Sequence, residues 1–414
     1  MKKLLVFLFC SFSLFAFAQN NIEKLHMASG NYCTYPVQFK AQTPAPKGYV
    51  PFYISHYGRH GSRYMTSSRP YENMVDLFES AEKANALTPL GKDVQKRILQ
   101  AAKDADKRSG ELSPLGARQH QAIAHRMYDS FPAVFAGNAK VDAHSTTSIR
   151  VILSMSNFCQ QLRALNPKLK ISMDASQHDM YYLASDGTYK NDEWKEKKFS
   201  ELDQKFDSAH VKPARLLKII FSDEEFVKKH VNGPHFMGDL YNITEDMQCL
   251  DTNISFLDLW QNEELFDYWQ TDNLSWYRSS GLMEYSQERE QKSQFNLLRD
   301  ILDKADSAIV GKGNSADLRF GHDTYVCRLT ALMQISGCYA KTTDYDNLYK
   351  VWCNTNIVPM AANLQLIFYR KPGNNEVLVK IMVNEQERTI PVKTNTWPYY
   401  NWKDVEAFYR NIIK

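Results

Sequence analysis

The sequence contains a five-residue cluster, Arg59-His60-Gly61-Ser62-Arg63, in which one histidine lies between two arginines. A neutral imidazole can attack an electrophile through a ring nitrogen. The planar fork of donors on arginine matches the oxygens of a phosphate group. We therefore interpret the cluster as a site for a phosphoryl group, with His60 as the nucleophile and Arg59 and Arg63 as phosphate-binding residues.

Two further polar clusters could complete this chemistry, and they contain Arg150 and the pair His322-Asp323. Arg150 can neutralise charge on the phosphate oxygens, and His322 can donate a hydrogen bond to one of them. Asp323 is the candidate general acid for the leaving alkoxide and then the base for the hydrolytic water. Taken singly, these residues also fit a surface turn, a solvated helix and a helix N-cap. Their conjunction favours the catalytic interpretation.

Each cluster follows a strand-like run, and a helix pattern follows two of the three. The runs cover residues 49–55, 140–145 and 317–320, and the helix patterns cover 146–165, capped by Ser145 or Thr146, and 325–335. Strand–loop–helix units predict an α/β fold with a mostly parallel sheet and helices on both faces. Ligands bind at the carboxyl ends of such strands, where all three clusters are expected.

A change of composition divides the chain. Residues 156–314 are rich in charged residues, aromatics and helix formers, which predicts a mostly helical lobe. We expect this lobe to be inserted into an α/β core formed by residues 19–155 and 315–414.

The last hundred residues return to strand patterns. The runs 363–370 and 377–383 flank the turn sequence Pro-Gly-Asn-Asn, which predicts a β-hairpin, and a final helix is expected over 402–413.

The N-terminus has the pattern of a signal peptide. Lys2 and Lys3 precede an apolar run over residues 4–15, and Ala16-Phe17-Ala18 fits a cleavage site. A membrane anchor is the alternative, but the run is shorter than the roughly 20 residues that a spanning helix needs. We therefore expect residues 1–18 to direct export to the periplasm or the medium, and we expect no membrane span.

The charge and the cysteines limit the function classes. Removal of Lys2 and Lys3 lowers the formal charge from +3 to +1, which gives no support for a nucleic-acid or membrane-surface partner. Six cysteines remain after Cys10, so up to three disulfides are possible, with buried free thiols as the alternative. No C-x-x-C pair occurs, which argues against a zinc site or a redox motif, and no cofactor is expected.

The three clusters resemble the motifs of a known family, the histidine acid phosphatases of the histidine phosphatase superfamily, branch 2. Residues 59–63 resemble its R-H-G-x-R signature, and Gly321-His322-Asp323-Thr324 resembles its distal H-D motif. The segment 110–120 is similar to the family's L-T-x-x-G-x-x-Q/E helix opening, and 145–150 together with Ser154 is similar to its S-T-x-x-x-R segment. The resemblance extends to the C-terminal strands and so covers most of the mature chain.

The resemblance implies a two-lobe architecture, a phosphohistidine intermediate and no metal. By motif, His60 corresponds to the nucleophile and Asp323 to the proton donor. The residues that correspond to phosphate ligands are Arg59, Arg63, Arg150 and His322.

Within the family, residues 112–135 and 260–277 are similar to the multiple inositol-polyphosphate phosphatases. Two positions depart from that group: Asp323 directly follows His322 where the group has H-A-E, and Met65 replaces a proline. An inositol polyphosphate such as phytate is the expected substrate. Lysines of the helical lobe could hold its other phosphates, and the candidates are Lys190, Lys195, Lys197 and Lys198.

Three other functions remain open. The first is a general acid phosphatase for sugar phosphates or other small monoesters. The second is an inactive protein that binds phosphorylated ligands. The third is a metal-dependent hydrolase, because His56 lies four residues before His60 and His120 lies near His125, but carboxylates are missing beside His56 and His60.

Overall fold

The structure is a computed structural model, and it describes residues 23, 25–36, 40–184, 193–281 and 292–414, with the side chains left out in 193–199. The expected signal peptide, residues 1–18, lies outside these residues.

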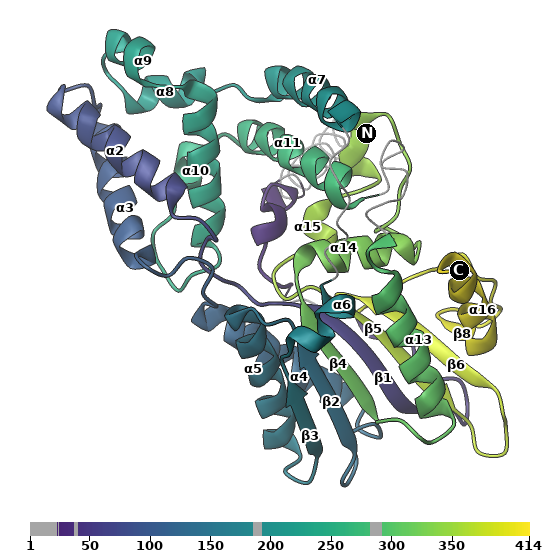
Figure 1. The fold of residues 1–414 in the computed structure, drawn as a ribbon. Coiled ribbons are helices and arrows are strands. Elements are labelled where there is room, and N and C mark those ends of the chain that lie inside the picture. Colours follow the sequence, from purple (N-terminus) through teal and green to yellow (C-terminus); the bar gives the residue numbers. More distant parts are fainter. Residues whose placement is uncertain (1–22, 24, 37–39, 185–192, 282–291) are drawn as a thin grey trace, which may run out of the picture.

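An eight-stranded sheet forms one half of the molecule (Figure 1). The strand order is β3-β2-β4-β1-β5-β6-β7, with β8 paired to β6. The first four strands of this order are parallel, and β5 to β8 are antiparallel to their neighbours. The strands are β1 (Val50–Arg59), β2 (Lys140–Ser145), β3 (Lys170–Asp174), β4 (Ala316–Gly321), β5 (Asn363–Arg370), β6 (Val377–Val383), β7 (Gln386–Glu387) and β8 (Tyr399–Asn401).

Helices cover both faces of the sheet, as expected for the predicted fold class. On one face, α4 (Pro114–Ser130) and α5 (Ile149–Leu165) pack on inward-facing strand residues such as Ile54 and Phe320. On the other face, α13 (Phe295–Ile309), α14 (Asp323–Leu332) and α16 (Trp402–Ile412) pack against residues such as Tyr53 and Tyr57. Adjacent residues of β1 therefore alternate between two apolar cores. The hairpin predicted for the C-terminal strands is confirmed, since β5 and β6 pair in antiparallel register.

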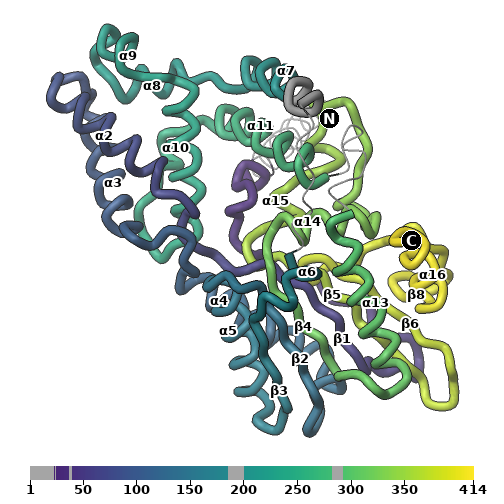
Figure 2. The backbone as a smooth tube through the Cα atoms, in the orientation of Figure 1, coloured from purple at the N-terminus to yellow at the C-terminus, as the bar shows by residue number. Residues whose placement is uncertain are grey.

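A second group of helices gathers apart from the sheet (Figures 1 and 2). Their shared apolar core includes Phe78, Phe236 and Trp269. Helices α2 and α3, which come early in the chain, pack in this core together with α8, α10 and α11. The helices of this part are α2 (Arg69–Lys83), α3 (Pro89–Ala105), α7 (Glu193–His210), α8 (Ala214–Ile220), α9 (Glu224–His230), α10 (Gly233–Met247) and α11 (Asn262–Ser280). The predicted division of the chain into 19–155, 156–314 and 315–414 stays a prediction. The packing places α2 and α3, which precede residue 156, in the helical layer.

Short elements lie between the longer ones. They are the 3-10 helices η1 (Gly30–Tyr32), η2 (Gln177–Asp179), η3 (Leu257–Leu259) and η5 (Tyr345–Lys350), and the short helices α6 (Met180–Leu183) and α15 (Asn354–Ile357). Both η1 and α15 contact α11, and η1 contacts α10 as well. The chain before β1 therefore lies between the helical layer and the sheet.

The helix after β2 begins later than predicted. Neither Ser145 nor Thr146 caps it, because α5 begins at Ile149 with Ser148 at its N-cap. Ser145 is still the last residue of β2, and the Thr146 amide donates to the Phe320 carbonyl at 3.1 Å. Pairing with β4 thus continues past the strand end and delays the helix.

The six cysteines outside residues 1–18 are buried free thiols, so the alternative without disulfides describes this chain. Within the described ranges, no helix has both the length and the apolar composition needed to cross a bilayer.

Two buried histidines lie in the core beneath α4 and α5. The ring of His56 lies 5.3 Å from the rings of both Phe158 and Phe320, and that of His120 lies 5.8 Å from Phe320. Burial lowers the pKa of each histidine to about 3, and for His56 the charges of His120 and Arg319 lower it further. The folded protein therefore holds both rings neutral, whereas the unfolded chain protonates them below about pH 6.5.

We expect His56→Phe to weaken the loss of stability in acid. The folded-state pKa of His56 is depressed, so its contribution to the free energy of unfolding is present above about pH 6.5 and is lost as the pH falls toward 3. The free energy of unfolding changes with a slope of at most about 1.4 kcal/mol per pH unit from this residue. Urea unfolding across this range measures the slope, which is independent of any change in packing. His125→Phe, at an exposed histidine of α4, is the control for the substitution itself. An unchanged slope in His56→Phe would contradict the prediction.

Candidate active site

The carboxyl ends of β1, β4 and β2 lie side by side, because these strands are parallel neighbours. Arg59 is paired with Gly321 in the sheet, and the His60 amide donates to the Gly321 carbonyl at 3.0 Å. The rings of His60 and His322 are 5.8 Å apart, and Thr146 Oγ1 lies 3.2 Å from His322 Nε2. The three clusters predicted from the sequence therefore meet at one edge of the sheet.

The hydrogen bond of His60 determines its tautomer. His60 is 1% exposed, and its Nδ1 lies 2.9 Å from the Gly61 carbonyl oxygen. A carbonyl only accepts, so Nδ1 carries the proton and Nε2 of the neutral ring keeps its lone pair. Burial lowers the pKa of His60 well below its ordinary value, and the charges of Arg59, Arg63 and Arg150 lower it further. The ring is thus held in the nucleophilic form, with Nε2 as the reactive atom.

Hydrogen bonds from two helices hold the loop that follows His60. The Gly61 amide donates to Ser154 Oγ at 3.1 Å, and this hydroxyl donates to the Arg150 carbonyl at 2.8 Å. The Ser62 amide donates to Gln119 Oε1 at 2.8 Å, and Gln119 Nε2 donates back to Ser62 Oγ at 2.9 Å. Both α4 and α5 therefore fix the backbone beside the nucleophile.

The same loop contacts the first turn of α4 backbone to backbone. A Cβ atom on Gly61 would lie 2.4 Å from the Gly116 carbonyl oxygen, and one on Gly116 would lie 2.2 Å from the Ser62 carbonyl oxygen. Only glycine allows this approach at either position. The helix begins with Ser113 as its N-cap, whose amide also donates to the Ser62 carbonyl at 2.9 Å.

Arg59 is fully buried and has acceptors from three separate segments. Its Nη1 donates to the carbonyls of Asn31 at 2.6 Å and Val358 at 2.5 Å, and its Nη2 forms an ion pair with Asp323 at 2.8 Å. This guanidinium therefore ties the segments before β1 and before β5 to the start of α14.

Arg63 and Arg150 bring two more guanidinium groups to the site. Arg63 Nη1 donates to Tyr32 Oη at 2.9 Å and to the Tyr64 carbonyl at 3.0 Å, and its Cζ lies 4.8 Å from the centroid of the Tyr32 ring. Burial lowers the pKa of Arg150, the charges of Arg63 and Arg59 lower it further, and Asp323 opposes them. The side chain of Arg150 thus shares the electrostatic environment of the other two arginines.

The Nε atoms of these three arginines are buried and have no hydrogen-bond partner among the described residues. A buried donor without an acceptor costs about 1–3 kcal/mol, and more when it carries charge. A phosphate group, with several acceptor oxygens and negative charge, matches this need. The arrangement therefore favours a bound anion.

His322 and Asp323 begin α14, as its N-cap and its first residue. Burial and the charges of the three arginines together lower the pKa of His322 to about 4, although the charge of Asp323 opposes them. Above this pH the ring is neutral and can still donate one hydrogen bond.

Asp323 is ionised in the protein without a ligand. Burial alone would raise its pKa, but the charges of Arg59, Arg63 and His322 outweigh burial, and the pKa lies below its ordinary value. Asp323 Oδ1 accepts a hydrogen bond from the Thr324 amide at 2.9 Å, which also favours the ionised form. An anion beside the arginines would offset their charge and raise this pKa toward that of a proton donor.

Several residues at the site were not predicted to take part. Gln119 and Ser154 lie in segments that carry the resemblance, but nothing in their spacing pointed to the backbone of residues 61–62. Thr146 was interpreted as a helix cap and instead contacts His322. Tyr32 lies in η1, outside every motif, and carries no sequence signal that could have found it.

One group of described side chains has the donor types of a metal site: His144, Asp174 and Asp179. His144 Nε2 lies 3.2 Å from Asp142 Oδ2, and Nδ1 lies 2.6 Å from Asp179 Oδ2. The hydrogen bond to Asp142 raises the pKa of His144 to about 9, and that to Asp179 adds to it against the effect of burial. An imidazolium with both nitrogens protonated is a poor metal ligand, so this group is an ion-paired cluster.

The histidines considered for a metal-dependent hydrolase have other surroundings. His56 and His120 lie among aromatic rings, His60 is bonded to Gly61, and the exposed His125 lies 3.2 Å from Asp129. Of the lysines considered for further phosphates, Lys190 lies outside the described residues, as do the side chains of Lys195, Lys197 and Lys198.

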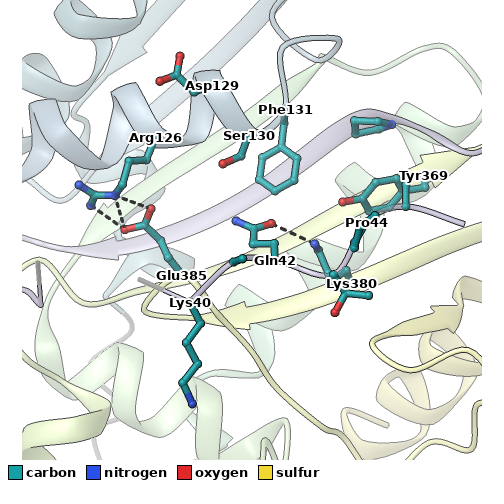
Figure 3. Close-up of a pocket in the computed structure, with 14 residues that line it drawn as sticks. Lys40, Gln42, Pro44, Arg126, Asp129, Ser130, Phe131, Tyr369, Lys380 and Glu385 are labelled. Carbon is teal, nitrogen blue, oxygen red and sulfur yellow. Dashed lines mark hydrogen bonds and ion pairs between the residues drawn. The ribbon is translucent and has the colours of Figure 1, made fainter. Parts of the chain in front are cut away.

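Figure 3 shows a separate cavity of about 600 Å³ between the segment 40–45, the end of α4 and strands β5 and β6. Arg126 and Glu385 form an ion pair at 2.7 Å on one side, and Lys380 Nζ donates to Gln42 Oε1 at 3.0 Å on the other. Arg126, Glu385 and Lys380 thus have partners within its wall, and none of the six predicted site residues lines it. We place the chemistry at the strand ends.

Comparison with known proteins identifies a family that matches most of the chain. The family described as histidine phosphatase superfamily (branch 2) matches residues 58–384, which include all six predicted site residues. A sequence search of curated proteins gave no match.

Solved structures with a similar fold include three phosphatases from different organisms. The multiple inositol polyphosphate phosphatase of Bifidobacterium longum, in complex with inositol hexasulfate, has a TM-score of 0.73 at 18% identity and covers 92% of this chain and 97% of its own. The phytase from D. castellii has a TM-score of 0.73 at 16% identity, covering 94% and 85%. Hafnia alvei phytase has a TM-score of 0.55 at 12% identity, covering 90% and 98%. At these identities the likeness shows a shared fold.

We expect Gly116→Ala to displace the loop of residues 60–63, because the new Cβ would meet the Ser62 carbonyl and not a movable side chain. A misplacement of about 1 Å can cost about 100-fold in rate, so kcat for a phosphate ester should fall by about that factor. Gly373→Ala is the matched control, since Gly373 has a φ of +74° but nothing within 4 Å of its added Cβ. It should lose about 1–2 kcal/mol of stability and keep full activity. Equal rates for both variants would show that the glycine contact does not position the nucleophile.

Proposed function

The chain belongs to branch 2 of the histidine phosphatase superfamily, and we propose that it is an exported enzyme that removes phosphate from inositol polyphosphates such as phytate. Family membership makes it a histidine-type phosphomonoesterase. One observation carries the assignment of the site: a neutral His60 whose proton is held on Nδ1, next to three arginines with unpartnered Nε donors.

In the first step, Nε2 of His60 attacks the phosphorus, and the bond between phosphorus and the ester oxygen breaks. Arg59, Arg63, Arg150 and His322 donate to the phosphoryl oxygens, whose charge they neutralise in the transition state. Asp323 in its protonated form gives its proton to the leaving alkoxide. The products are the free alcohol and a phosphohistidine with Nδ1–H still bonded to Gly61.

In the second step, a water molecule attacks the phosphohistidine. The Asp323 carboxylate takes one proton from this water, the bond between Nε2 and phosphorus breaks, and inorganic phosphate leaves. His60 returns to the neutral tautomer and Asp323 to the protonated acid, so the cycle closes without a metal or a cofactor.

Substrate binding supplies the proton donor that this cycle needs. The arginines hold the pKa of Asp323 low while the site has no anion. A phosphate group cancels part of that charge, so its arrival raises the pKa and favours protonation from solvent. Because this protonation is easier at low pH, we expect the enzyme to work best in acid.

The proposed substrate rests on the similar structures. Two of the enzymes that share this fold are named as phytases, and one as a multiple inositol polyphosphate phosphatase that was crystallised with inositol hexasulfate. Export rests on the sequence pattern of residues 1–18 alone.

The substrate class is tested by comparing phytate with glucose 1-phosphate under one set of conditions. We expect kcat/KM for phytate to be higher by at least about tenfold, because interactions with the additional phosphates favour the transition state. His60→Ala should release no phosphate from either compound, which shows that the measured activity comes from this site. Equal kcat/KM values would instead favour a general acid phosphatase for small monoesters. An intact monoester with the wild-type protein from acidic to neutral pH would favour a binding protein.

The role of Asp323 is tested with leaving groups of different basicity. Asp323→Asn should slow hydrolysis of an alkyl phosphate by about 100- to 10,000-fold, because the alkoxide leaves only when protonated. Release of p-nitrophenol, a far weaker base, should slow much less. Pre-steady-state burst measurements of each ester isolate the first step. Equal losses for the two esters would remove Asp323 from the role of general acid.

A further inference from the structure

The helical layer places buried carboxyl groups behind the arginines. Glu245 and Asp246 of α10 are 5% and 0% exposed, and neither forms an ion pair within the described ranges. Isolated buried carboxylates are costly, so such groups usually hold a proton or have a function. The catalytic steps above use neither residue.

Asp246 contacts the end of the nucleophile loop. Tyr71 Oη of α2 donates to Asp246 Oδ2 at 2.8 Å, and the backbone of Met65, two residues after Arg63, also stabilises the ionised carboxylate. The second oxygen, Oδ1, is buried without a hydrogen-bond partner among the described residues. The carboxyl group is therefore fixed in place, although only one of its two oxygens has a hydrogen-bond partner among the described residues.

Charged and titratable groups reach Asp246 from each neighbouring element. Arg63 comes from the loop after β1 and favours the carboxylate, and Tyr71 comes from α2. Asp246 acts in turn on Tyr32 of η1, on Glu245 of its own helix and on Cys249 just after that helix. Arg63 is the one cation in this set. A negatively charged Asp246 and a bound phosphate would therefore both interact with the positive charge of Arg63.

We propose that Asp246 is a positioning residue that tunes the phosphate site: protonated, it leaves the charge of Arg63 to the substrate, and ionised, it competes for that charge. The inference rests on the proposed function, because it takes Arg63 as a phosphate ligand. The effect is reciprocal, so a bound dianion also favours the protonated form of Asp246.

Asp246 changes between the competing and the non-competing form near neutral pH. Burial raises the pKa of Asp246 to about 7, although Tyr71, Arg63 and Met65 oppose it. The protonated form, which favours anion binding, therefore predominates below this pH and is lost above it. Tyr32 and Cys249 have pKa values raised to about 12, so they do not titrate in this window.

The site histidine and carboxyl groups titrate elsewhere. While the site holds no anion, the pKa of His322 is lowered to about 4 and that of Asp323 lies below its ordinary value, so in the free protein both have changed form well below neutral pH. Burial raises the pKa of Glu245 well above its ordinary value, and the charge of Asp272 raises it further. Glu245 interacts with Arg59, whereas Asp246 interacts with Arg63 and has a pKa of about 7.

Inorganic sulfate is a suitable probe, because it keeps both negative charges from about pH 5 to about pH 9 while the charge of a phosphate ester changes. We expect sulfate, measured by isothermal titration calorimetry with the full chain, to bind the wild type about tenfold more weakly at the upper than at the lower end of this range. Asp246→Asn should lose the part of this dependence that is centred near pH 7. Asp272→Asn, a change of the same kind in α11 at a carboxylate bonded to Asn354, should keep the wild-type dependence.

Tyr71→Phe provides a second test with the carboxyl group intact. In the wild type, the hydrogen bond from Tyr71 lowers the pKa of Asp246. Removal of this bond should therefore raise the pKa and move the midpoint of the affinity loss to higher pH. A merely structural role would weaken binding equally at all pH values in both variants.

The outcomes separate the two proposals. If sulfate binds the wild type at no pH, the arginines are not the anion site, and the proposed function fails together with this inference. If sulfate binds but Asp246→Asn keeps the wild-type pH dependence, or if the wild type shows none, this inference is overturned and the phosphatase site stands.

Discussion

The burial of one guanidinium group, that of Arg59, determines how the rest of the site is assembled. A buried ion loses several kcal/mol of hydration, which only well-placed partners recover. The partners of Arg59 are the carbonyls of Asn31 and Val358 and the carboxylate of Asp323. These groups come from three distant parts of the chain, so the charge is satisfied only when all three are in place. The strand end that carries the nucleophile therefore forms together with its surroundings.

The positive field that results explains the ionisation states at the site. Burial together with this field keeps His60 and His322 neutral, and for Asp323 the field outweighs burial and keeps the carboxylate ionised; these forms suit nucleophilic attack, hydrogen-bond donation and stabilisation of Arg59. An arriving phosphate reduces the same field and so changes Asp323 from an ion-pair partner into an acid. The positive charge of the arginines thus stabilises the ligand-free protein and also supports the first step of the reaction.

The strands and the catalytic motifs could be predicted because their signals are local. Residues 140–145 form β2 with the predicted bounds, and the predicted hairpin forms, since both patterns depend on neighbouring residues. The cap of α5 was misplaced because pairing of Thr146 with β4, a contact with a distant segment, extends the strand end. The support from Gln119 and Ser154, and the packing of α2 and α3 with later helices, also depend on long-range contacts that no local pattern contains.

The thiols of the chain lead to a practical conclusion. Burial raises the pKa of Cys338 and Cys353 to about 11 and that of Cys33 and Cys249 to about 12. Oxidants and disulfide exchange act on the thiolate, which is then less than about one part in a thousand at neutral pH. The folded enzyme has no cross-link among its six described cysteines to form or to reduce. A reducing bacterial cytosol is therefore as suitable for producing active enzyme as an oxidising compartment, and reducing agents can be left out of its storage buffers.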